Sequence, residues 1–136
     1  MSTKTLIAGL IGGVTSYLLG WLLYGILFRD MTIELAGMPG IMRAETDLIM
    51  WALILGSLSM GMFTSYIFAT WTSISTFISG LRAGAIIALL MSVGSDMISY
   101  ATTNVYQLNG ALLDVALTVV IGGVVGGVVG WWLGRK

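Results

Sequence analysis

Hydrophobic residues along the chain fall into four long runs separated by short polar segments. The runs cover residues 5–28, 48–70, 80–103 and 110–133. A helix needs about 20 residues to cross the hydrocarbon core of a bilayer, at a rise of about 1.5 Å per residue. Each run is therefore long enough to span a membrane. The pattern predicts an all-α integral membrane protein in which four transmembrane helices form an up-down bundle.

The second helix is expected to begin before its hydrophobic run. Gly37-Met38-Pro39-Gly40 is a turn signal, and no helix breaker follows it between Ile41 and Asp47. The expected helices therefore cover about 5–28, 41–70, 80–103 and 110–133, with an outer loop at 29–47. Because the other two connections are short, neighbouring helices should be antiparallel. All 136 residues then belong to a single membrane domain.

Charged residues are scarce and unevenly placed. The chain has six basic and six acidic residues and no net charge, which excludes a basic surface for nucleic acid. It has no Cys and no His, so disulfides, thiolate chemistry and the commonest metal ligand are missing. Enzymes that act on lipids or isoprenoids usually need several acids, a His or basic residues. We therefore expect no enzyme activity, no metal and no cofactor.

The basic residues near the helix ends predict the orientation. Lys4, Arg82, Arg135 and Lys136 would lie on the side of the termini, against Arg29 and Arg43 on the other side. Since cytoplasmic ends carry the excess of Lys and Arg, we expect both termini in the cytoplasm. The first run is too long for a signal peptide and ends in charged residues rather than a cleavage site. A multi-pass protein of a bacterial inner membrane is the expected localisation.

Glycines recur at helical spacing in the last and first runs. Gly122, Gly126 and Gly130 are four residues apart, and the first run carries Gly9, Gly13 and Gly20. Such glycine-zipper strips let two helix backbones approach closely, which drives helix association in lipid. The strips predict tight packing, either within the chain, in a homo-oligomer or against a partner membrane protein.

Asp96 is the most informative polar residue, because a carboxylate inside a span costs several kcal/mol unless it is paired, hydrated or protonated. It belongs to a stripe at helical spacing that also contains Ser92, Ser95, Ser99, Tyr100 and Thr103. The second span can answer this stripe with Gly56, Ser57, Gly61, Thr64 and Ser65. One interpretation is a proton or ion relay or a polar substrate path. The other is a set of hydrogen bonds that fixes the helix register.

Asp114 stands near the outer start of the fourth run, where the helix dipole favours a carboxylate. At that depth it could meet Asp96 or Tyr100 in an outward-facing polar pocket. Trp21 and Tyr24 are typical of interfacial anchors.

Short motifs resemble a bacterial four-helix membrane protein family of unknown function (domain of unknown function 1761). They are Leu19-Gly20-Trp21-Leu22-Leu23-Tyr24-Gly25, Thr102-Thr103-Asn104, Leu112-Leu113-Asp114 and the closing Trp131-Trp132. The resemblance implies the same four-helix fold. It implies no mechanism, because the family has no settled activity.

Two functions follow from these features. The stripe around Asp96 favours a transport or channel-type role, and the glycine strips favour a non-catalytic scaffold or accessory subunit. In both cases the expected surroundings are the lipid bilayer and either further copies of the chain or a partner membrane protein.

Overall fold

The computed structural model describes residues 1–136 and consists of helices joined by short connections. Its elements are α1 (Thr3–Leu22), the π-helical turn η1 (Leu23–Leu27), α2 (Arg29–Glu34), the 3-10 turn η2 (Glu45–Asp47), α3 (Met50–Thr70), α4 (Phe77–Thr102) and α5 (Leu108–Leu133). Four segments are long and apolar enough to cross a membrane, namely 3–27, α3, α4 and α5. The predicted all-α fold with four membrane-spanning helices is confirmed, and the chain is a multi-pass integral membrane protein.

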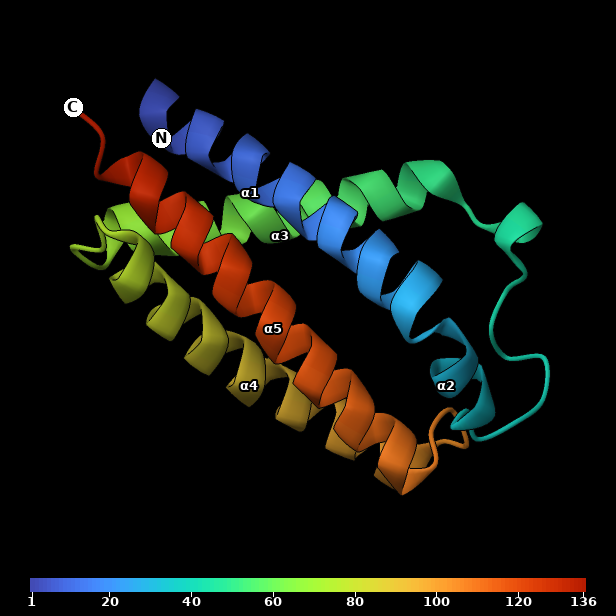
Figure 1. Ribbon diagram of the computed structural model, residues 1–136. Coiled ribbons are helices and arrows are strands. Elements are labelled where there is room, and N and C mark those ends of the chain that lie inside the picture. Colours follow the sequence, from blue (N-terminus) through green and yellow to red (C-terminus); the bar gives the residue numbers. More distant parts are fainter.

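The four spans pack in pairs. α4 packs on α5, α3 packs on α1, and α1 joins the pairs by packing on α5 (Figure 1). Both termini lie at one end of the bundle, where the Lys4 ammonium donates a hydrogen bond to the Arg135 carbonyl. We call this end the terminal end. The opposite end, which carries residues 28–49 and 103–107, is called the loop end.

α4 and α5 touch backbone to backbone. A Cβ atom added at Gly126 would lie only 2.9 Å from Cα of Gly84, and one added at Gly80 would overlap the Gly126 carbonyl. A Cβ at Gly122 would likewise overlap the Ala88 side chain, and one at Gly130 would lie 3.1 Å from Cα of Gly80. Dispersion between such closely packed backbones stabilises a helix pair in lipid, where no hydrophobic effect draws helices together.

α1 and α3 cross in the same way. A Cβ atom at Gly13 would lie 2.7 Å from Cα of Leu58, and one at Gly9 would lie 3.1 Å from Cα of Met62. The glycine contacts of both pairs are therefore made within one chain. Gly20 is an exception to the predicted packing strip, because no atom lies within 4 Å of its Cβ position. The two helices diverge toward the loop end beyond their crossing (Figure 1), so Gly20 faces open space instead of a helix.

The expected start of the second helix near residue 41 is wrong. α3 begins at Met50, and Ala44 and Leu48 have extended backbone conformations. Every residue from 38 to 49 is exposed, so a helix there would have no surface to pack against. A short helix without tertiary contacts is marginal, because nucleation costs more than a few hydrogen bonds return.

The start of α4 and the content of the outer loop also differ from the prediction. α4 begins at Phe77 rather than 80, because the Thr76 side chain caps it by accepting a hydrogen bond from the Ser79 amide at 3.1 Å. The predicted outer loop contains the short helix α2.

Backbone hydrogen bonds tie the two loop-end connections together. The Gly37 amide donates to the Val105 carbonyl at 2.9 Å, and the Gln107 amide donates to the Leu35 carbonyl at 3.2 Å. Ala36 and Tyr106 form an isolated antiparallel bridge between them. The segment after α2 is thus held against the connection between α4 and α5.

We predict that Gly84→Leu lowers the free energy of unfolding by about 3 kcal/mol, because the new side chain must push α4 away from α5. Thermal unfolding in detergent measures the change. Gly94→Leu is the matched control on the same helix, since nothing lies within 4 Å of its Cβ position. Equal losses in the two variants would contradict close backbone packing at Gly84.

Candidate functional site

The contact between α4 and α5 brings two acidic residues together inside the membrane. Gly80 meets Gly126 and Gly84 meets Gly122, so in an antiparallel pair residue 92 is level with residue 114. Asp96 is then one helical turn farther toward the loop end. Asp114 is the charged group that acts on Asp96. The structure therefore places Asp96 and Asp114 in one cluster, which we call the carboxyl pair.

Asp96 is only 6% exposed. Its Oδ1 accepts a hydrogen bond from the Ser95 hydroxyl at 3.3 Å, whereas its Oδ2 is buried and has no partner. Buried polar atoms are nearly always hydrogen-bonded, and leaving a carboxylate oxygen unpaired in a low dielectric is costly. With both carboxyl groups ionised, Oδ2 therefore has no donor, and Asp114, which is close enough for a side-chain hydrogen bond to Asp96, supplies one only when it carries a proton.

Asp114 is held by a tyrosine from another span. The Tyr24 hydroxyl donates to Asp114 Oδ1 at 2.8 Å and lies 3.3 Å from the Thr118 hydroxyl. Thr118 is one turn along α5 from Asp114, so the two side chains share a face of that helix. Tyr24 belongs to the π-helical turn η1, and such turns inside α-helices are frequent at functional sites.

Tyr106 lies beside the carboxyl pair at the loop end. Burial, followed by the negative charges of Asp114 and Asp96, raises the pKa of the Tyr106 phenol to about 12. The phenol is therefore neutral at physiological pH and keeps its proton for hydrogen bonding. The backbone bridge to Ala36 holds it in place.

The predicted polar stripe does not act as a unit. Ser92 is buried with Asp96, but its hydroxyl donates to the Ala88 carbonyl of its own helix at 2.7 Å. Ser95, Tyr100 and Thr103 are exposed, and Ser99 is half-buried. Only Asp96 therefore contributes a free polar atom to the site.

The second span does not face this stripe. α4 packs on α5, whereas α3 packs mainly on α1. Ser65 donates its hydrogen bond to the Thr5 carbonyl of α1 at 2.6 Å, at the terminal end. Glycine faces, rather than hydroxyl groups, decide which helices become neighbours.

Three residues of the site were not predicted from the sequence as site residues: Tyr24, Tyr106 and Thr118. Thr118 follows Asp114 by four residues, and this spacing is a usable signal for a shared helix face. Tyr24 had no such signal, because its partner lies 90 residues away in the sequence. A tyrosine near a helix end is otherwise typical of an interfacial anchor.

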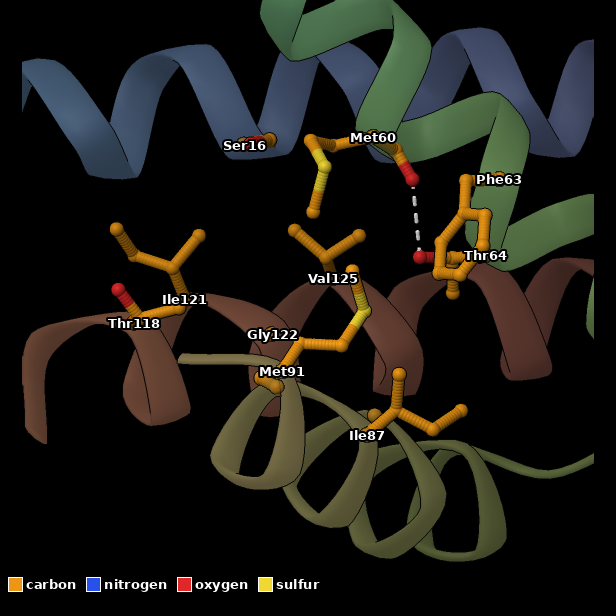
Figure 2. A pocket seen from close by; sticks show the side chains of 12 residues that line it. Ser16, Met60, Phe63, Thr64, Ile87, Met91, Thr118, Ile121, Gly122 and Val125 are labelled. Atoms are coloured by element: carbon orange, nitrogen blue, oxygen red, sulfur yellow. Dashed lines mark hydrogen bonds between the residues drawn. The ribbon is translucent and has the colours of Figure 1, made fainter. Parts of the chain in front are cut away.

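A small cleft of about 80 Å³ continues from Thr118 toward the terminal end. Figure 2 shows Met60 of α3, Met91 of α4 and Val125 of α5 pointing into a common space. The Thr64 hydroxyl on its wall donates to the Met60 carbonyl of its own helix at 3.0 Å (Figure 2). The cleft is therefore an apolar continuation of the polar cluster.

Comparisons with protein-family models, with curated proteins and with solved structures found no match. The resemblance to the bacterial four-helix family stays a prediction.

We predict that Tyr24→Phe lowers the free energy of unfolding by about 1–2 kcal/mol, because Asp114 loses its donor in a poorly solvated place. Chemical or thermal unfolding in detergent measures the change. Tyr66→Phe is the control, since Tyr66 is exposed on α3. If both variants unfold alike, the Tyr24 contact does not contribute to stability.

Proposed function

We propose that this protein is a small transport or channel-type protein that carries protons or small monovalent cations by way of Asp96 and Asp114. The observation that carries the proposal is the buried Oδ2 of Asp96, which has no partner and lies beside a second carboxyl group within a membrane span. Ionisable residues inside spans commonly mark ion and proton pathways.

The chain supplies no positive charge to this cluster. Its one ion pair joins Arg29 to Glu45 at the loop end, and no basic side chain acts on Asp96. Two carboxylates that share a site repel each other when both are charged. A proton or cation taken up from outside relieves this repulsion and gives Asp96 Oδ2 its missing partner.

The surrounding residues suit a site that exchanges its cation at the loop end. Tyr106 lies on the loop-end side of the carboxyl pair and offers a neutral phenol, and the Tyr24 hydroxyl lies at the level of Asp114 and Thr118. On the other side, α5 has no hydroxyl or charged side chain between Thr118 and Arg135. We propose that the cleft that begins at Thr118 widens, and that a cation then crosses the terminal-end half of the membrane along it. With both termini in the cytoplasm, the loop end faces outward.

Proton flux into liposomes tests this proposal. The purified protein is reconstituted around a pH-sensitive dye, and a membrane potential is imposed with potassium and valinomycin. We expect acidification of the lumen that Asp96→Asn slows by about 100-fold, the scale on which a positioned proton-transfer group acts. Parallel runs with sodium-sensitive and potassium-sensitive dyes, in which a pH gradient and a proton ionophore replace valinomycin because valinomycin itself carries potassium, distinguish a proton from a metal cation.

Asp30→Asn is the matched control, because Asp30 is an exposed acid in α2 away from the carboxyl pair. It should conduct as the unaltered protein does. The proposed function is wrong if the imposed potential drives no more protons, sodium or potassium into liposomes with the unaltered protein than into empty liposomes.

A non-catalytic scaffold or accessory subunit is the second candidate. The observation that favours it is the exposure of the cleft walls at Met60, Phe63 and Met91. Methionine side chains adapt to varied apolar partners, so a helix of another copy or of a partner membrane protein would fit there. A scaffold predicts no flux from the purified protein alone, which separates it from the first candidate.

A further inference from the structure

A second and larger hollow lies between α1 and α3 in the loop-end half of the bundle. These helices cross near Gly13 and diverge beyond it, which leaves a groove of about 660 Å³. This volume lies in the range of small-molecule sites in proteins. The groove is distinct from the mid-membrane cleft, with which it shares no lining residue.

The walls of the groove are apolar along most of their length. Trp21 and Ile26 line one side, and Met50 and Leu53 line the other. The lining on the first span runs from Tyr17 to Arg29. The span ends at Leu27, and the ten residue steps from Tyr17 to Leu27 cover at most about 15 Å at α-helical rise, half of a hydrocarbon core that is about 30 Å thick. The groove is therefore about as deep as one leaflet.

The loop-end mouth of the groove is charged. Arg29, Arg43 and Glu45 all line it, and Arg29 pairs with Glu45 at 3.4 Å. Arg43 makes no ion pair, so the charged residues that line the mouth sum to one positive charge, whereas Asp30, Glu34 and Asp47 of the same segment do not line the groove. Guanidinium groups bind phosphate oxygens with two parallel hydrogen bonds, which makes arginine well suited to phosphate recognition.

We propose that this groove binds one anionic phospholipid, with the phosphate at Arg43 and Arg29 and an acyl chain along Trp21 and Leu53. The groove has basic residues at its mouth and apolar walls about one leaflet deep below them. A phospholipid has its phosphate and its acyl chains in the same order. A soluble anion would leave the apolar walls uncovered. A zwitterionic lipid offers the same phosphate but adds an ammonium group, which the excess positive charge of the mouth would repel.

This site goes beyond the proposed transport function and does not depend on it. Tyr24 nevertheless borders both places, since it lines the groove and its hydroxyl donates to Asp114. A lipid in the groove therefore contacts the residue that holds one member of the carboxyl pair.

Native mass spectrometry of the purified protein tests the lipid site. The protein is titrated with phosphatidylglycerol or with phosphatidylcholine of the same acyl chains, and bound lipids are counted. We expect one phosphatidylglycerol to bind in preference to phosphatidylcholine. Arg43→Gln should weaken that binding roughly tenfold, the scale of a lost charged hydrogen bond. Arg82→Gln is the matched control, because Arg82 is an exposed arginine near the terminal end of α4.

Two further variants test the charge and the shape of the site. Glu45→Gln should strengthen phosphatidylglycerol binding, because Arg29 is then freed from its ion pair. Gly20→Leu should abolish binding by filling the groove, whose open space lies at its Cβ position. Gly94→Leu, which also points into open space but lies on α4 outside the groove, should bind lipid as before.

Four outcomes would overturn the proposal. Equal binding of the two lipids, or equal effects of Arg43→Gln and Arg82→Gln, would mean that no anionic headgroup is recognised. Binding of inorganic phosphate without binding of either lipid would point to a site for a free anion. A dimer that Gly20→Leu dissociates, without any lipid preference, would show that a second copy fills the groove.

Discussion

Close backbone contact between α4 and α5 is the interaction on which the rest of the structure depends. Lipid gives helices no hydrophobic reason to associate, so the glycine faces that meet at Gly84 and Gly126 must hold this pair together. The contact also fixes the register, and through the register it sets the distance between Asp96 and Asp114. A shift of one residue in α4 would turn Asp96 by about 100°, away from its partner.

The bilayer imposes a second constraint, since each polar group must find its partner within the protein. Most hydroxyl groups in the spans satisfy it locally, as Thr64 and Ser92 do by donating to the carbonyl four residues earlier. Asp96 Oδ2 is the one buried side-chain oxygen or nitrogen that has no partner. All other buried side-chain polar atoms have partners within the protein. This one exception is therefore the strongest indication of a site that binds a proton or a cation.

Hydrophobic runs alone predicted the four spans, and glycine spacing predicted that α5 approaches another helix closely. Neither pattern predicts which helix packs on α5, because a glycine strip can pack against any equally flat helix surface. For this reason the sequence offered two neighbours for Asp96, polar residues of α3 and Asp114 of α5, and the structure packs α4 on α5. Gly20 shows the same limit, since the crossing angle of α1 and α3 turned an expected packing residue into part of a groove. Tyr24 was predicted only as an interfacial anchor, because its contact with Asp114 depends on a π-helical turn and on a partner that is distant in sequence.

The central claim is that Asp96 and Asp114 interact, and a double-mutant cycle on stability tests it most directly. Asp96→Asn, Asp114→Asn and the double variant are unfolded thermally in detergent at one pH. Groups in contact show coupling energies of about 0.5–3 kcal/mol, whereas distant sites add within about 0.5 kcal/mol. We predict coupling of about 1 kcal/mol or more for this pair, and additivity for Asp96→Asn combined with the exposed Asp30→Asn. Additive effects of Asp96→Asn and Asp114→Asn would contradict the carboxyl pair and the function proposed for it.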